Sequence, residues 1–161
     1  MNLTSNSTAK KLFEALRLRG LKIVFAESCT AGLAADALAR IPGASGVLWG
    51  SYITYSEAAK QTMLGVPAHI IEQFGVVSGE TAQAMAAGAL EHSGADIAAA
   101  VTGFCGPTAI PGKNAVGDVW FAALARQGAS LVEFRHFRGG RNGIRKAAAQ
   151  ALIETALRAI I

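Results

Sequence analysis

The stretch Ala26-Glu27-Ser28-Cys29-Thr30-Ala31-Gly32 decides how the chain is organised. It follows a short apolar run rich in β-branched residues, 21–25, and it precedes residues 33–38, which favour a helix. This order predicts a strand, a tight turn and a helix. A hydroxyl at such a junction lies near free backbone N–H groups and the positive end of the helix dipole, which suits a bound anion or a nucleophile that generates an oxyanion. The alternative is that Ser28 or Thr30 only caps the helix.

The composition predicts a single folded domain. The chain has 161 residues, of which 52% are hydrophobic and 16% charged, and this balance argues against disorder and for a sizeable core. No apolar run reaches the roughly 18 residues that span a bilayer, and the polar first residues lack the apolar region of a signal peptide. We therefore expect one domain over residues 1–161, with residues 1–7 disordered, in the cytoplasm and without a membrane partner.

The two cysteines, Cys29 and Cys105, lie in stretches of small residues. Neither belongs to a CxxC motif or to a Cys/His spacing typical of metal sites. We expect two free thiols and no bound metal.

The net charge of +4 permits an acidic partner. No aromatic residues alternate with the basic ones, so nucleic acid is not favoured as a partner. A single region is clearly basic, and a phosphorylated small molecule explains a cluster of this size as well as a phosphate backbone does. The alternative is a solvated surface. The cluster consists of Arg135, Arg138, Arg141, Arg145 and Lys146.

Strand patterns alternate with helix patterns along the chain, which is typical of an α/β domain. The last two strand patterns are separated by a short turn and predict a hairpin, so the sheet should be mixed. We predict a single-domain three-layer α/β/α sandwich with a mixed, mostly parallel sheet. The expected strands cover residues 21–25, 47–55, 96–102, 116–125 and 131–137, and the expected helices 8–18, 33–41, 57–64, 68–74, 79–93 and 142–160.

Three strand ends carry residues suited to chemistry, and the strand ends of α/β folds are where ligands bind. They are residues 28–30, residues 54–56 with Lys60 one turn beyond, and residues 102–107. The last segment has two glycines three positions apart, which let the backbone approach a ligand closely and offer N–H donors. A plain turn is the alternative for this loop.

Arg141 and Arg145 lie four residues apart at the start of the last helix. Together with the helix N-terminus they can hold a phosphate from one side, although a solvent-facing pair is the alternative. The histidines do not gather, so a serine nucleophile needs another base, and a lysine with a lowered pKa can serve. We take Lys60 as the candidate, with Tyr55 relaying a proton or orienting the lysine, although spacing alone does not distinguish Lys60 from other lysines.

Taken together, six blocks of the sequence resemble the C-terminal domain of the competence/damage-inducible CinA family, whose characterised members are nicotinamide-nucleotide amidases. The blocks follow the family's order and spacing and cover nearly the whole chain. They are AESCTAG (26–32), YITYSEAAK (52–60), LGVP (64–67), GVVSGETAQAMAAGAL (75–90), VTGFCGP (101–107) and VGDVWFA (116–122).

The resemblance implies that the protein hydrolyses the amide of nicotinamide mononucleotide (NMN) to nicotinate mononucleotide and ammonia, in pyridine-nucleotide recycling. It implies a serine nucleophile at Ser28 and a lysine base at Lys60, with Tyr55 beside them, and no metal or cofactor. The loop from Thr102 matches the family's substrate-binding loop, and Arg141 matches an arginine after the last strand. We therefore expect substrate contacts from Thr30, Gly32, Thr102, Gly103, Cys105, Gly106, Arg141 and Arg145.

The sequence departs from the family pattern at two places. The family usually has two glycines after the Cys-Thr of its first motif, and here the first of them is Ala31. After Pro107 the family runs on with several glycines and then Lys-Pro, whereas residues 108–115 read TAIPGKNA, with Asn114 at the usual lysine position and Lys113 one place earlier. The second departure bears on substrate contacts.

The alternative function is a non-catalytic nucleotide-binding module linked to competence or the DNA-damage response, and the altered 108–115 loop motivates it. A direct nucleic-acid role rests on the charge alone. The alanine-rich helix pattern around residues 81–90 and the expected strand edges also lead us to expect a homo-oligomer.

Overall fold

The computed structural model describes residues 3–160, and the side chains from Thr8 onward. Within this range the chain forms one five-stranded sheet with the strand order β2-β1-β3-β4-β5. β1 pairs in parallel with β2 and β3, whereas β3–β4 and β4–β5 are antiparallel. Among these strands only β4 therefore runs against the others, as the expected hairpin requires. The strands are β1 (Ile23–Glu27), β2 (Leu48–Ile53), β3 (Ile97–Gly103), β4 (Asp118–Ala125) and β5 (Ser130–His136).

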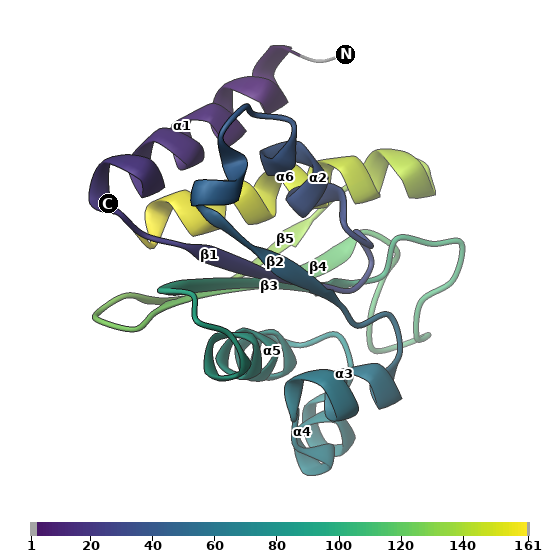
Figure 1. Cartoon of the computed structure of the whole chain (residues 1–161). Coiled ribbons are helices and arrows are strands. Elements are labelled where there is room, and N and C mark those ends of the chain that lie inside the picture. Colours follow the sequence, from purple (N-terminus) through teal and green to yellow (C-terminus); the bar gives the residue numbers. More distant parts are fainter. Residues whose placement is uncertain (1–2, 161) are drawn as a thin grey trace.

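Helices cover both faces of the sheet, which makes three layers (Figure 1). One face carries α1 (Leu3–Arg19), α2 (Leu33–Ala39) and α6 (Arg141–Arg158), and the other carries α3 (Glu57–Leu64), α4 (Ala68–Phe74) and α5 (Gly79–His92). A short 3₁₀ turn, Ala44–Gly46, precedes β2. The predicted three-layer α/β/α fold with a mixed sheet is confirmed. None of the helices described is long and apolar enough to cross a membrane.

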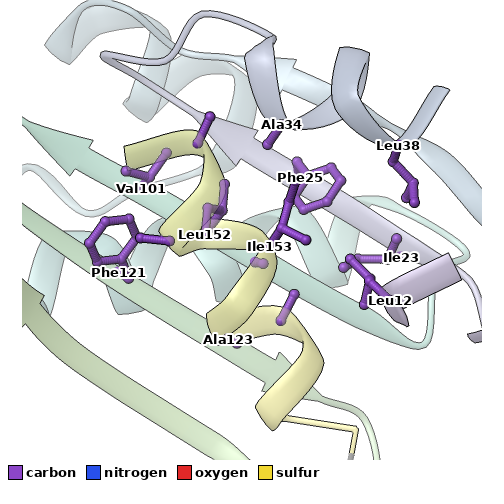
Figure 2. Packing of buried hydrophobic residues seen from close by; sticks show 14 of the residues in the cluster. Leu12, Ile23, Phe25, Ala34, Leu38, Val101, Phe121, Ala123, Leu152 and Ile153 are labelled. Atoms are coloured by element: carbon purple, nitrogen blue, oxygen red, sulfur yellow. The ribbon is translucent and has the colours of Figure 1, made fainter. Parts of the chain in front are cut away.

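The two faces of the sheet carry side chains of different size, so their helices pack at different distances from the strands. The face under α1, α2 and α6 carries large side chains such as Phe25, Val101 and Phe121, which meet Leu12 and Leu152 from the helices (Figure 2). The face under α5 is lined mainly by alanines, and α5 packs against them with small residues of its own. The helix therefore lies close to the strands. These alanines are Ala82, Ala86 and Ala89 of α5 and Ala26, Ala98, Ala100 and Ala122 of the sheet.

Several boundaries differ from those expected. α1 begins at Leu3 rather than at residue 8, so residues 3–7, expected to be disordered, belong to the helix, while Met1 and Asn2 lie outside the described residues. β2 ends at Ile53, two residues before its predicted end, and its irregularity falls at Trp49 and Gly50, as a mid-strand glycine predicts.

The carboxyl ends of β1, β2 and β3 meet at one edge of the sheet, because these strands are parallel and adjacent. The segments that follow them, beginning at Ser28, Thr54 and Phe104, therefore lie close together. α6 also begins at this edge, where Figure 1 shows its first turn above the loop between β3 and β4. All three predicted strand-end sites and the start of the last helix are thus brought to one place.

Candidate active site

The Lys60 amine and the Ser28 hydroxyl meet at this edge. Lys60 Nζ lies 2.9 Å from Ser28 Oγ and donates a second hydrogen bond of 2.9 Å to the backbone oxygen of Thr54. Ser28 comes directly after β1, and its N–H is bound to the oxygen of Val101 on β3. Ser56 caps α3 as expected, and this fixes the helix that carries Lys60 one turn later. A hydroxyl and an amine that lie 32 residues apart in sequence are thereby placed within hydrogen-bond reach.

The Lys60 side chain is only 1% exposed and has no carboxylate among its hydrogen-bond partners. Burial disfavours the charged amine, and this lowers the pKa of Lys60 from the usual 10.5 to about 8, while interactions with Cys29 and Glu57 oppose the shift. Near neutral pH a useful fraction of the amine is therefore uncharged and able to accept a proton.

The carboxylate of Glu27 occupies the N-terminus of α2, the place where the sequence predicted a bound anion or an oxyanion. Its fully buried carboxylate accepts hydrogen bonds from the backbone N–H groups of Gly32, Ala34 and Ala35, at 3.0–3.1 Å. Two hydroxyls, Thr30 Oγ1 and Ser51 Oγ, donate to it as well. The prediction of free N–H donors at this turn is wrong, because the chain supplies its own anion there.

The helix cap suggested as the alternative role of Ser28 or Thr30 is also absent. The N-cap residue of α2 is Gly32, with φ of 97° and no side-chain cap of its own. Glu27 does the capping from the preceding strand, which leaves the Ser28 hydroxyl free to face Lys60. The signal in the sequence was a carboxylate at the end of an otherwise apolar strand, and sequence reasoning gave it no role.

Arg145 holds the same turn from α6. Its Nε and Nη2 donate to the backbone oxygens of Cys29 and Thr30, at 2.9 and 3.0 Å. Within the turn Ala31 has φ of 50°, and it is the one non-glycine residue with positive φ among residues 3–160. The glycine usual in the family at this position is explained by this backbone conformation, which an L-residue adopts at a cost of about 1–2 kcal/mol.

A cavity of about 270 Å³ opens beside the Ser28–Lys60 pair. Its lining combines the turn that carries Ser28, the loop after β3 and the segment before α5. A larger hollow of about 370 Å³ lies at the opposite edge, beside the amino ends of β1 and β3, away from the Ser28–Lys60 pair. The lining of the smaller cavity is Ser28, Cys29, Tyr55, Lys60, Val76, Val77, Thr102, Gly103, Phe104, Cys105, Gly106, Thr108 and Arg141.

Tyr55 and Arg141 lie together in the wall of this cavity. Arg141 Nη2 donates to the Tyr55 hydroxyl at 2.6 Å, and Nη1 donates to the oxygen of Gly106. Tyr55 is 54% exposed and makes no hydrogen bond to Lys60 among the described residues. The backbone of Thr54, and not Tyr55, therefore orients the lysine.

The structure divides the expected substrate-binding residues into two groups. Thr102, Gly103, Cys105, Gly106 and Arg141 line the cavity, whereas Thr30, Gly32 and Arg145 lie outside its lining and support the turn.

Two of the lining residues also have evident packing roles. The Thr102 hydroxyl donates to the oxygen of Val76, which fixes the segment before α5. A Cβ at Gly103 would meet Val119 Cγ2 at 2.7 Å, so this glycine is required by the neighbouring strand β4.

Sequence reasoning gave no role to Val76 and Val77 of the cavity wall, because an apolar residue carries no chemical signature. Phe104 and Thr108 lie in the 102–107 and 108–115 segments that the sequence singled out, although neither was named as a site residue. Lys113, in the altered loop, reaches the segment beside Val76, since its Nζ would lie 3.0 Å from a Cβ on Gly75. Among residues 3–160, no group of three His, Cys, Asp or Glu side chains is placed to hold a metal ion.

The protein is therefore a three-layer α/β protein with a buried Ser/Lys pair at the carboxyl edge of its parallel strands. Comparison with known proteins identifies the family to which it belongs. Residues 5–160 match the family described as the CinA C-terminal domain. The chain belongs to this family, as its sequence blocks suggested.

Relatives with very different lengths share this domain. The nicotinamide-nucleotide amidohydrolase PncC of Enterobacter agglomerans is 40% identical over 147 residues, which cover 91% of this chain and 90% of the relative. A CinA-like protein of Akkermansia muciniphila is 43% identical over 84% of this chain, but the match spans only 33% of that longer protein. A putative competence-damage inducible protein of Caldicellulosiruptor saccharolyticus is 42% identical over 92% of this chain and 36% of its own length.

Solved structures agree with the fold in detail. A competence/damage inducible protein from Agrobacterium tumefaciens superposes with a TM-score of 0.92 at 39% identity, covering 98% of this chain and 99% of that one. A CinA superfamily protein from Klebsiella pneumoniae gives the same TM-score at 29% identity, over 99% and 98% of the two chains.

Proposed function

We propose that the protein is an amidohydrolase that converts NMN to nicotinate mononucleotide and ammonia, with Ser28 as nucleophile and Lys60 as general base. The observation that carries the proposal is the 2.9 Å contact between Ser28 Oγ and a buried amine whose pKa is lowered to about 8. A serine hydroxyl is a weak nucleophile unless a neighbouring base removes its proton. Lys60 fulfils that requirement without a histidine.

The reaction follows from this pair in two halves. Ser28 Oγ attacks the carboxamide carbon while neutral Lys60 accepts the hydroxyl proton, and the carbonyl oxygen becomes an oxyanion. Protonated Lys60 then gives its proton to the amide nitrogen, ammonia leaves, and an ester to Ser28 remains. Lys60 then takes a proton from water, which attacks the ester carbon; the bond to Ser28 Oγ breaks, Lys60 returns the proton to Ser28, and nicotinate mononucleotide leaves.

The oxyanion must be received by donors outside the N-terminus of α2, because Glu27 occupies those amides. Backbone amides of the loop after β3, at Cys105 and Gly106, belong to the cavity wall and are the candidates we propose. The cavity, at about 270 Å³, is slightly smaller than most ligand pockets, which run from about 300 to 1,000 Å³. We infer that it takes the pyridine carboxamide and that the ribose phosphate extends toward Arg141.

The similarity to a relative named as a nicotinamide-nucleotide amidohydrolase over 90% of that relative's length supports this substrate. Other relatives are named as competence-damage inducible proteins, which keeps a non-catalytic nucleotide-binding role as the alternative.

Ammonia release from NMN by the purified protein tests the proposal. Ser28→Ala and Lys60→Met should each abolish turnover, whereas Lys10→Met, which alters an exposed lysine on α1, serves as the matched control and should retain the wild-type rate. Binding of NMN without ammonia release would favour the alternative role. Full activity in both active-site variants would rule out the proposed mechanism. If the protein neither binds NMN nor releases ammonia from it, NMN is ruled out as the substrate.

A further inference from the structure

Two thiols lie side by side in the wall of the cavity. Cys29 follows the nucleophile Ser28, and Cys105 lies in the loop after β3. β1 and β3 are neighbouring parallel strands in which Glu27 is opposite Val101, so the two segments leave the sheet together. Both cysteines line the cavity, and both are free, buried and part of one hydrophobic cluster. The prediction of free thiols is therefore confirmed, but the amidase chemistry uses neither of them.

The two thiols are chemically unequal. The interaction with the Cys29 thiol, and then the positive charges of Arg141 and Arg145, lower the pKa of Cys105, against the effect of burial. The same interaction between the thiols, together with burial, raises the pKa of Cys29 well above its ordinary value. Cys105 is thus the sulfur that becomes a thiolate first, and Cys29 remains a thiol beside it.

We propose that Cys29 and Cys105 are a redox modification site, where a small peroxide that enters the cavity converts the pair into a disulfide and thereby disables the Ser28–Lys60 pair. The Cys105 thiolate attacks one peroxide oxygen, the O–O bond breaks, and water leaves after protonation, which gives a sulfenic acid on Cys105. The Cys29 sulfur then attacks the sulfenic sulfur, the S–S bond forms, and a second water leaves. The two thiols lose two electrons and two protons, the peroxide takes them up as two waters, and an external dithiol reverses the change.

The disulfide should disturb catalysis because its two ends hold the catalytic turn and the cavity loop. Sulfur atoms that are not bonded to each other stay about 3.5–4 Å or more apart, and they must approach to about 2 Å when a disulfide forms. Cys29 is adjacent to Ser28, and its backbone oxygen is fixed by Arg145, so the strain falls on the turn that aims the nucleophile. A displacement of about 1 Å in a catalytic group costs on the order of a hundredfold in rate.

Mass spectrometry of the full-length protein tests bond formation without reference to any substrate. After treatment with hydrogen peroxide the intact protein should lose two hydrogen atoms, both free thiols should disappear together, and a peptide pair joined through Cys29 and Cys105 should be found. Dithiothreitol should restore the original mass. Cys105→Ala and Cys29→Ala should each fail to lose the two hydrogens, while oxygen should add to the remaining sulfur more readily when that sulfur is Cys105.

The rate is then compared between oxidised and reduced forms of each protein, so that every variant is its own reference. For the wild type, ammonia release from NMN should fall about a hundredfold on oxidation and recover with dithiothreitol, whereas in Cys105→Ala the oxidised and reduced rates should agree within twofold. Sulfinic acid or separate adducts on the two cysteines without an S–S bond would overturn the site. If the disulfide forms and the rate is unchanged, the proposed loss of activity on oxidation is wrong. If no form releases ammonia, the proposed substrate fails, and the mass measurement still decides the disulfide.

Discussion

Replacing Glu27 by glutamine tests whether the buried carboxylate holds the turn that carries Ser28. The side chain is fully buried, has no cationic hydrogen-bond partner among the described residues, and accepts five hydrogen bonds of 2.7–3.2 Å. In Glu27→Gln the remaining oxygen can still serve the three donors at Oε2, namely Thr30, Gly32 and Ala34. The new NH₂ group then faces the N–H of Ala35, and this bond is lost.

The magnitude follows from these losses. A buried donor without a partner costs about 1–3 kcal/mol, and the loss of a negative charge at a helix N-terminus costs about 0.3–1 kcal/mol. Ser51 can rotate its hydroxyl to accept from the new NH₂ group, so its bond need not be lost. We expect Glu27→Gln to lower the free energy of unfolding by about 3 kcal/mol, and Glu27→Ala, which leaves every donor unpaired, by about 5 kcal/mol or more.

Urea unfolding followed by tryptophan fluorescence measures the effect, with Glu72→Gln as the control because Glu72 is exposed on α4. The same variants should lower kcat for NMN more than they raise KM, because the Ser28 turn loosens while the cavity wall persists. A Glu27→Gln protein within about 0.5 kcal/mol of the wild type would refute the view that the five contacts stabilise this turn.

Three further changes probe the lysine, the turn and the helix packing. Between pH 8 and 10.5 the unfolded chain keeps the Lys60 proton that the folded protein has lost, so the wild type should gain about 3 kcal/mol of stability relative to Lys60→Met over this interval; urea titrations at several pH values would show it, and a constant difference would contradict the lowered pKa. Ala31→Gly should stabilise the protein by about 1 kcal/mol, because it removes the strain of φ at 50°, and a loss of stability in urea would count against strain at this turn. Gly88→Ala should destabilise by about 3 kcal/mol or more, since the added Cβ would lie 1.9 Å from the backbone oxygen of Leu64 and force α3 from α5; an unchanged thermal midpoint would show that the two helices separate freely.

Local patterns were sufficient to predict most of the elements. The serine caps of α3 and α5, the glycine after α3 and the strand–helix alternation predicted those elements within one or two residues. The alanine-rich β3 was ambiguous in sequence, because alanine suits both structures. Its environment decides the outcome: Ala98 and Ala100 lie under α5, and Ala99 faces the other layer.

The active-site geometry was less accessible to sequence reasoning. Lys60 meets Ser28 through space, so only the family resemblance distinguished it from other lysines. The role of Glu27 was missed because a side chain that caps a helix from the preceding strand matches no local capping pattern. Arg145 was expected to hold a phosphate, yet its Nε and Nη2 donate to two carbonyl groups of the turn, and no residue pattern predicts these contacts.

The most direct measurement is the titration of Lys60 itself, compared with the pH dependence of the reaction. NMR of selectively labelled lysine side chains should show one resonance, absent in Lys60→Met, that titrates near pH 8, and kcat/KM for NMN should rise with the same apparent pKa. A Lys60 resonance that titrates at the ordinary value of 10.5, or a rate that does not change between pH 6.5 and 9 while Lys60 loses its proton, would contradict the role of this amine as the base.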